Sequence, residues 1–528
     1  MAPKTLTDLP PELQLAVIDH VQKPSDLKSL CLTSRELRDA ALPKLYHEVV
    51  IEFDRCQMPT LNGFFLADNA GRAYTQLLFF RKISTKDSAS AWRTISMALH
   101  LLRRDSLTDI SLPSPLVLDL DFLLTLSANQ RKLKQLYLPQ GIEDIKGFHE
   151  IIKRATKLTE LWLDIYRTHS NKDIDKQLHA NVDSDGLLLS TLFSHVTPFG
   201  AGPALQLTSL KLFNARLRFA TRSLSRTIDF CTLQRLYLTS CTGADSLLLA
   251  MTHTFSAGSP ALQIFAYGGG ALQAAVIEGF LVSFAGLITL KLLYDPDGDT
   301  PLFDLASLRN HRRTLTRLVL HMVKRELGGD KHLISLPLQE MSKLRQECSE
   351  LKQAALALPT IALGDASRAE LGEFGLAIDD LAKLKDLRTL KILSWPILPS
   401  GQFLYEDDAG EPETAGDRLA RFQPFNQIRT LELMNGFATQ LLRRFASAKG
   451  ESRVSSLPTL WFGTNKASSL CAMDVERRTK VAMQPLCYLA VSQTDRYGRT
   501  LLKAERIPSE ERQYLIGSVE ARSAVENA

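Results

Sequence analysis

The chain has 528 residues, of which 45% are hydrophobic and 23% are charged, and this composition is typical of a globular protein with a substantial core. Its 63 Lys and Arg residues against 58 Asp and Glu residues leave a formal net charge of +5, a small bias that disfavours a dedicated nucleic-acid binder. The seven cysteines are scattered and include no Cys-x-x-Cys pair, so we expect a reducing compartment and neither a disulfide framework nor a zinc site. The sequence shows no signal peptide and no apolar run long enough to span a membrane, so we expect a cytoplasmic or nuclear protein.

The first expected element is a short helix that begins at a double proline. Thr7 or Asp8 can cap this helix, and Pro10 or Pro11 occupies its first turn. The apolar residues that recur at helical spacing are Leu13, Val17, Ile18 and Val21.

A second helix is expected after a break at 23–26. It carries Leu27, Leu30 and, one turn on, Leu37, while Pro43 closes the unit and 49–53 is expected to be a strand. Some of these apolar residues must form an inner core. A module of about forty residues is marginal by itself, however, which favours burial of part of its apolar surface in a partner.

The rest of the chain contains an internal repeat: an apolar residue, two residues of any kind, an apolar residue, one of any kind, and an apolar residue. Successive repeats often begin 25 to 29 residues apart. Clear repeats begin at Leu133, Leu158, Leu207, Leu233, Leu287, Leu315, Leu387, Ile428 and Leu457, and weaker ones at Tyr74, Leu107, Leu262 and Leu358.

The fourth and sixth residues of each repeat lie two positions apart, so they share one face of a short strand. Stretches with helical patterning lie between the repeats, at 148–155, 246–255 and 272–284. One strand and one helix cannot bury their apolar faces alone, so the units are expected to stack.

Three gaps in the period are expected to hold insertions, near 164–186, 323–357 and 401–417. The first is polar, the second contains an apparent long amphipathic helix over 338–356, and the third is an acidic loop rich in Gly and Pro. Each is either a tolerated surface loop or a binding element. Near the C-terminus, strands over 486–491 and 500–504 are expected to form a hairpin, which either caps the last repeat or is a loosely attached tail.

From Tyr74 to Phe462 the repeats resemble the leucine-rich-repeat family. Cys241 stands where that family carries Asn or Cys, whereas Ala215 and Gly436 depart from this pattern. The resemblance implies an α/β fold in which an irregular leucine-rich-repeat solenoid, a horseshoe, occupies 49–465 and a C-terminal cap or tail occupies 466–528.

The segment Leu6–Tyr46 resembles an F-box. Leu-Pro-Pro-Glu-Leu at 9–13 matches the Leu-Pro-x-Glu-Leu of that family, and Asp26-Leu27 matches the start of its second helix. Residues 33–37 depart from the Val-Cys-x-x-Trp of many members, as in a fungal-type variant. We therefore expect a helical F-box at 1–48.

The two resemblances together imply the substrate-recognition subunit of an SCF-type ubiquitin ligase, which binds the Skp adaptor and, through it, the cullin. Such a subunit catalyses no reaction, needs no cofactor or metal, and holds an unidentified target protein. The residues expected to bind the adaptor are Leu9, Pro10, Leu13, Val17, Ile18, Val21, Leu27, Leu30 and Leu37. The alternatives are a protein-interaction scaffold without ubiquitination and, more weakly, a nucleic-acid-associated repeat protein.

The target is expected to bind the strand residues that point away from the core, which are the third and fifth of each repeat. These positions carry several of the aromatic and basic residues that commonly anchor interfaces. The expected target-binding residues are Tyr137, Trp162, Lys211, Arg235, Tyr237, Lys291, Arg317, Lys391 and Trp461. The alternative is that insertions such as 171–186 fold over these side chains and bury them.

No motif supports an enzyme active site. The acidic stretch 295–300 lacks the glycine and glutamate of a calcium-binding EF-hand, and the glycines at 268–270 read as a bend after a repeat strand, not as a phosphate loop. No H-E-x-x-H or G-x-S-x-G motif occurs. The basic residues between 311 and 325 are more typical of a solvated face than of a nucleic-acid site.

Overall fold

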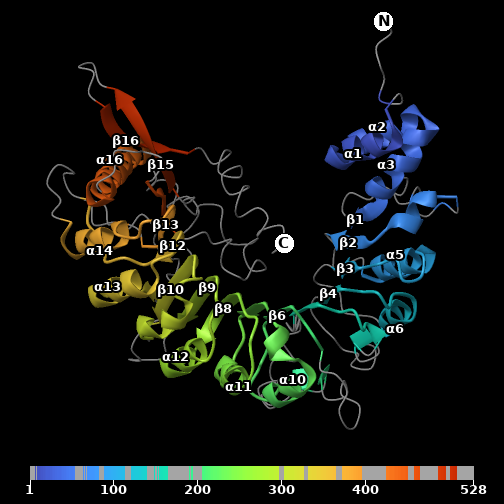
Figure 1. Cartoon of the computed structure of the whole chain (residues 1–528), viewed down its shortest axis with the longest axis horizontal. Coiled ribbons are helices and arrows are strands. Elements are labelled where there is room, and N and C mark those ends of the chain that lie inside the picture. Colours follow the sequence, from blue (N-terminus) through green and yellow to red (C-terminus); the bar gives the residue numbers. More distant parts are fainter. Residues whose placement is uncertain are drawn as a thin grey trace, which may run out of the picture. The chain divides into compact units, whose positions relative to one another are not determined.

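We analysed a computed structural model of the chain (Figure 1). It divides into two compact units, Met1–Gln234 and Arg235–Ala528, here called unit 1 and unit 2. The structure describes residues 6, 9–53, 64, 66, 68–81, 88–112, 120–138, 148, 151–152, 154–164, 189–190, 192–193, 205–295, 303–325, 331–363, 371–394, 396, 424–449, 457–463, 486–494 and 500–507.

Unit 1 opens with three helices, α1 (Pro11–His20), α2 (Pro24–Thr33) and α3 (Arg35–His47). Thr7 and Asp8 lie outside the described residues, and the residue that precedes α1 is Pro10, which makes no side-chain capping bond. The expectation that Leu37 continues the second helix is wrong. Ser34 separates α2 from α3, and it caps α3 by accepting a hydrogen bond from the Leu37 N–H at 3.2 Å. Pro43 lies inside α3 and does not end it.

The rest of unit 1 is a parallel sheet whose strands follow one another in chain order. Each strand pairs with the next in register, and the helical segments between them supply the second layer. The strands are β1 (Glu48–Glu52), β2 (Leu77–Arg81), β3 (Asp109–Ser111), β4 (Gln135–Leu138), β5 (Glu160–Asp164) and β6 (Ser209–Phe213). The helical segments are η2 (Ala70–Tyr74), α5 (Ser88–Leu101), α6 (Leu120–Asn129), α10 (Thr221–Thr227) and η5 (Phe230–Thr232).

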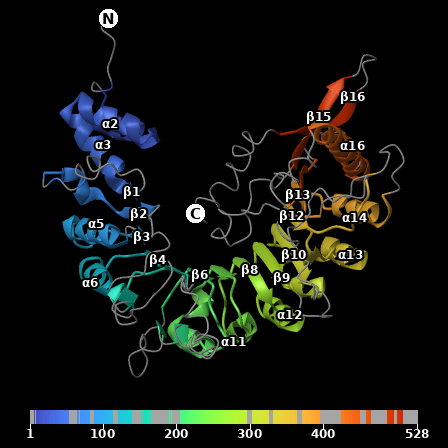
Figure 2. The ribbon, with the colours of Figure 1, turned by 180° about the vertical axis from the view of Figure 1, so that it is seen from behind.

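Unit 2 repeats this architecture, with its helices α11 to α14 on one face of the sheet in both views (Figure 1, Figure 2). Its parallel strands are β7 (Arg235–Thr239), β8 (Ile264–Ala271), β9 (Thr289–Asp295), β10 (Arg317–Arg325), β12 (Gln353–Leu356), β13 (Thr389–Ile392) and β14 (Thr459–Phe462). Its helices are α11 (Ala244–Ala257), α12 (Ala274–Val282), η6 (Leu305–His311), α13 (Leu338–Glu347), α14 (Gly372–Ala382) and α16 (Pro424–Lys449).

The predicted C-terminal hairpin is confirmed, and it extends the sheet of unit 2. β15 (Leu486–Thr494) pairs antiparallel with β14, and β16 (Thr500–Arg506) pairs antiparallel with β15. Helix α16 covers this end of the sheet: Thr439 Oγ1 accepts a bond from the Ala504 N–H at 3.0 Å, and Arg443 Nε donates to the Leu502 carbonyl at 3.2 Å. These bonds occupy backbone groups of an edge strand that would otherwise be open to pairing with another chain.

The repeat period is confirmed for most of the predicted repeats, but three strand assignments are wrong. The segment 428–433 lies inside helix α16, because buried residues in α16 recur at helical spacing over a longer stretch than the six-residue motif. These buried residues are Met434, Phe437, Ala438, Leu441, Leu442 and Phe445.

The other two errors concern register. The helix expected over 338–356 ends at Glu347, and β12 follows it, so the repeat begins at Leu351 and not at Leu358. Leu77 of β2 pairs with Asp109 of β3, the third residue of its repeat, so the motif placed at Tyr74 is one residue out of register. A short antiparallel strand, β11 (Lys331–Leu333), also pairs with the end of β10.

The glycines at 268–270 lie within β8 instead of forming a bend after it. Gly269 has a φ of +84°, and the pairing with β9 shifts between Gly268 and Ala271. The insertions at 171–186 and 401–417, the turn at 495–498 and residues 296–300 of the acidic stretch lie outside the described residues.

His311 is buried at the end of η6, so the prediction that it belongs to a basic surface is wrong. Its Nδ1 accepts the Leu287 N–H at 3.2 Å, so its Nε2 carries the proton and donates to the Leu281 carbonyl at 3.0 Å. Burial lowers the pKa of His311 to about 4, and the ring is therefore neutral at neutral pH.

This burial predicts a pH-dependent stability. The pKa of His311 is about 4 in the folded chain and near 6.5 when unfolded, so the unfolded chain binds more protons between these values. The contribution of the buried, neutral His311 to the free energy of unfolding is complete above pH 6.5, and it is lost as the pH falls toward 4. We expect His311→Phe to destabilise the chain by roughly 2 to 4 kcal/mol at neutral pH, because two buried backbone groups lose their partners. The difference in the free energy of unfolding between this variant and the unsubstituted chain should be smaller by about 2 kcal/mol at about pH 5.

Urea midpoints at both pH values measure this difference. His253 is exposed on α11, so His253→Phe is the matched control and should show no such decrease. A difference for His311→Phe that stays constant between the two pH values would contradict the assigned role of His311.

Candidate protein-binding surfaces

Helix α1 exposes most of its large apolar side chains and buries Ile18 together with a polar residue, Gln14. Its buried residues are Gln14 and Ile18, and Gln14 Nε2 donates to the Leu9 carbonyl at 2.8 Å. Leu13 and Val17, one turn apart on another face of the helix, are 52% and 41% exposed. Exposed apolar side chains beside a satisfied inward glutamine are typical of a protein-binding surface.

The other residues predicted to contact the adaptor divide by burial. Ile18, Leu27 and Leu37 form the inner core of the module with Ala41, so they hold the three helices together. Pro10 is exposed and Leu9 is half-buried, while Val21 and Leu30 are half-buried and pack against the core. Adaptor binding by these residues stays a prediction, and among them Pro10, Leu13 and Val17 are the ones whose side chains are most open to a partner.

Two further exposed leucines lie in the same module and are not among the residues predicted to bind the adaptor. Leu15 on α1 is 49% exposed and Leu32 on α2 is 80% exposed. Neither lies on the apolar stripe predicted from helical spacing. Their signal in the sequence was an excess of large apolar residues over what one face of a ten-residue helix can bury.

The second candidate surface is the strand face, defined as the side of each sheet formed by the third and fifth residues of the repeats. On this face the third residues of successive repeats form the third-position row, and the fifth residues form the fifth-position row. The fourth and sixth residues are buried on the helical side, as predicted. In unit 1 the strand pairing places Tyr137 beside Trp162 and Trp162 beside Lys211 in one row. The expected row of fifth-position residues is therefore confirmed in this unit.

These residues of unit 1 form a cluster in mutual contact. The rings of Tyr137 and Trp162 are 4.2 Å apart, those of Trp162 and Phe213 are stacked at 5.1 Å, and Lys211 Nζ lies 4.6 Å from the centre of the Trp162 ring. Such ring and cation contacts contribute to stability when they are shielded from water. Burial raises the pKa of Tyr137 well above its usual range, and the nearby carboxylate of Asp164 adds to the effect.

Polar groups border this cluster. Asp164 Oδ1 accepts a hydrogen bond from Asn214 Nδ2 at 2.8 Å. Trp162 Nε1 is buried and has no hydrogen-bond partner among the described residues. Burial also raises the pKa of Asp109 in the third-position row, and the charge of Glu160 on the same face adds to that shift.

In unit 2 the fifth-position row runs from Tyr237 past Ala266 to Lys291, and then past Val319 and Ala355 to Lys391 and Trp461. Arg235 and Arg317 lie in the third-position row of the same strands. Tyr237 is 9% exposed and Lys211 of unit 1 is 8% exposed, while the other predicted target residues are half-buried. Target binding by these residues stays a prediction.

The basic residues between 311 and 325 do not form one patch. His311 is internal, Arg312 and Arg313 are exposed before β10, and Arg317 belongs to the strand face. The side chains of Lys324 and Arg325 lie outside the described ones.

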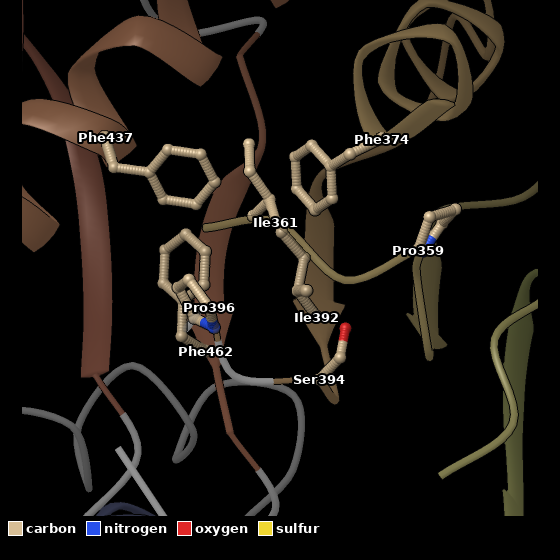
Figure 3. Close-up of a pocket in the computed structure, with 8 residues that line it drawn as sticks. All are labelled: Pro359, Ile361, Phe374, Ile392, Ser394, Pro396, Phe437 and Phe462. Atoms are coloured by element: carbon tan, nitrogen blue, oxygen red, sulfur yellow. The ribbon is translucent and has the colours of Figure 1, made fainter. Parts of the chain in front are cut away.

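A pocket in unit 2 offers no site for a ligand. Pro359, Ile361, Phe374, Ile392, Ser394, Pro396, Phe437 and Phe462 line about 180 Å³ of space between β13, β14, α14 and α16, with no room for a water molecule (Figure 3). Ser394, its one polar side chain, donates to the Leu358 carbonyl at 3.0 Å. The pocket is a packed apolar junction.

Among the described residues, no three His, Cys, Asp or Glu side chains gather in a way that could hold a metal ion. No described helix is both long and apolar enough to cross a bilayer.

No protein-family model and no curated protein matches the chain. Among solved structures, it is similar to a chain in the crystal structure of a complex of Rad7 and Elc1 from yeast. The two are 15% identical with a TM-score of 0.40, and the match covers 75% of this chain and 91% of that chain.

The contacts within the unit 1 cluster predict that Trp162 stabilises the fold. We expect Trp162→Ala to lower the free energy of unfolding by about 2 to 4 kcal/mol, because two ring contacts and a cation contact are lost with the buried area. Trp461 occupies the same row position in unit 2, and no aromatic partner is found for it among the described rings. Trp461→Ala is the matched control and should cost clearly less. Equal losses in chemical denaturation would contradict this role for Trp162.

Proposed function

We propose that the chain is the substrate-recognition subunit of an SCF-type ubiquitin ligase, in which the N-terminal module binds the Skp adaptor and the strand face binds a target protein. The observation that carries the proposal is the packing of α1, which turns Leu13 and Val17 outward and Gln14 inward. The Leu-Pro-Pro-Glu-Leu motif at 9–13, which resembles an F-box, leads into the same helix. Both features are found at the start of a chain of stacked strand and helix repeats.

In this role the chain catalyses no reaction. The adaptor links the N-terminal module to the cullin, and the repeats hold the target close to a ubiquitin-loaded enzyme, so that transfer becomes effectively intramolecular. We place this activity in the cytoplasm or nucleus. The scattered spacing of the cysteines, with no Cys-x-x-Cys pair, favours a reducing compartment.

A non-degradative scaffold is the second candidate function. It would use the same N-terminal surface to bind the adaptor but would not bring a target to a ubiquitin-loaded enzyme. A nucleic-acid-associated role is weakened by the burial of His311 and by the separation of Arg317 from Arg312 and Arg313.

The adaptor-binding surface is tested by Leu13→Gln together with Val17→Gln. We expect at least a tenfold loss of affinity for a purified Skp adaptor, because exposed apolar anchors dominate such interfaces. Helix content and melting temperature should not change, since both side chains already face water. Leu249 on α11 and Val282 on α12 are 47% and 55% exposed, so Leu249→Gln with Val282→Gln is the matched control and should bind normally. Unchanged binding by the first pair would disprove the assignment of α1.

The ligase role is tested separately from adaptor binding. Affinity capture of the full chain from cells with a blocked proteasome should recover the adaptor and the cullin, together with ubiquitinated target. The Leu13→Gln, Val17→Gln variant should lose adaptor and cullin but retain the target. Recovery of the adaptor without the cullin would favour the scaffold.

A further inference from the structure

The third- and fifth-position rows on the strand face of unit 2 carry positive charge only, and the C-terminal hairpin beside them adds Lys503 and Glu505 to this face. Its third-position residues are Arg235, Ile264, Thr289, Arg317, Gln353, Thr389 and Thr459, and its fifth-position residues are Tyr237, Ala266, Lys291, Val319, Ala355, Lys391 and Trp461. These two rows from β7 to β14 contain two arginines, two lysines and no acidic residue. His321, the seventh residue of the β10 repeat, lies on the same face.

The strand face of unit 1 has the opposite character. Its third-position row contains Glu48, Asp109 and Glu160, and Lys211 is the basic residue in its fifth-position row. The raised pKa of Asp109, caused by burial and by the charge of Glu160, fits this concentration of carboxylates. The rows on the two strand faces therefore have net charges of opposite sign, although the net charge of the whole chain is small.

The four cations of unit 2 are regularly spaced. Arg235 and Arg317 are separated by three strand steps along one row, and Lys291 and Lys391 by three steps along the next. With neighbouring strands about 4.8 Å apart, each pair spans about 14 Å. Four residues of an extended peptide cover about 13 Å, so acidic side chains four positions apart match either pair.

The residues between Lys291 and Lys391 are short, since they are Val319 and Ala355. Thr289 and the larger Ile264 lie between Arg235 and Arg317. Short side chains let a peptide backbone approach the sheet, while the long side chains on either side can reach its carboxylates. Arg235, Lys291, Arg317 and Lys391 are all half-buried, where charge-assisted hydrogen bonds are stronger than in open water.

We propose that the strand face of unit 2 binds an extended acidic segment of a target protein through Asp and Glu carboxylates. The inference rests on the proposed function in one respect, that the bound protein is a target for ubiquitination. The binding itself depends only on the arrangement of these four cations.

A nucleic acid fits this face less well. Duplex DNA presents one negative charge per about 1.7 Å of its axis, so binding it draws on many closely spaced cations. Here the cations in each row are three strands apart, and Tyr237 and Trp461 stand at opposite ends of the fifth-position row. The spacing suits separate carboxylates better than a continuous phosphate backbone.

The test uses the full chain and a fluorescent peptide with Glu at every fourth position, compared with the same peptide carrying Gln. Fluorescence anisotropy should show at least tenfold tighter binding of the Glu peptide at low salt. This difference should shrink at about 0.3 M salt, because screening weakens exposed charge contacts. Equal binding of the Glu and Gln peptides at low salt would overturn the proposal.

The combined variant Arg235→Gln, Arg317→Gln, Lys391→Gln should bind both peptides alike. Its matched control is Arg312→Gln, Arg313→Gln, Lys385→Gln, which removes the same charge from exposed positions off the strand face and should keep the preference for Glu. Circular dichroism and melting temperature check folding. If the triple variant does not fold, Arg317→Gln and Lys391→Gln singly should each weaken Glu-peptide binding about threefold. Unchanged binding in every folded variant would also overturn the proposal.

Two further measurements identify a different occupant. Tighter binding of a single-stranded oligonucleotide of equal charge, lost in the same variant, would assign the face to nucleic acid. Peptide binding that emerges only after the acids of 406–417 are changed to amides would assign it to the chain itself. Either result overturns the proposal. Adaptor binding is measured separately, so a failure of the ligase role and a failure of the basic face are distinguishable.

Discussion

A single backbone contact, which recurs from one repeat to the next, sets the register of most of the parallel strands. The carbonyl of the second residue of a repeat accepts hydrogen bonds from the N–H groups of the second and third residues of the next repeat. Thr108 O thus accepts from Lys134 N at 2.7 Å and Gln135 N at 3.0 Å, and Lys352 O accepts from Arg388 N at 2.8 Å and Thr389 N at 3.1 Å. A slip of one residue would turn every side chain to the opposite face of the sheet. The two rows of the strand face exist because this contact prevents that slip.

The repeated contact also explains how charge becomes organised. Residues about 30 positions apart in the sequence become neighbours about 4.8 Å apart, always in the same orientation. In unit 2 the third- and fifth-position rows become basic, and in unit 1 the third-position row carries three carboxylates beside a half-buried aromatic cluster. The helical side is the same in both units, since it consists of buried apolar residues. The helical layer therefore stabilises the repeats, and the strand face carries the charges by which the two units differ.

The N-terminal module follows a different principle. It is too small to bury all of its apolar residues, and its inner core is a cluster of Ile18, Leu27, Leu37 and Ala41. Lys44 Nζ ties α3 to the end of α1 by donating to the Ile18 carbonyl at 2.9 Å. The remaining apolar residues of α1 stay on the surface. The adaptor binding proposed above would bury these residues.

The sequence by itself determined the period of the repeats, the alternation of buried and strand-face residues, and the first two helices, because these depend on local spacing and on proline at a helix start. It could not fix the rotation of α1, since apolar residues lie around most of that helix and only tertiary contacts chose Gln14 and Ile18 as its inner face. It also misplaced 428–433, where the long helix α16 gained more burial than a short strand could, and it treated His311 as a surface charge although Leu281 and Leu287 hold the ring inside. The opposite charge of the two strand faces was decided by the strand register, because it brings together residues that are far apart in the sequence.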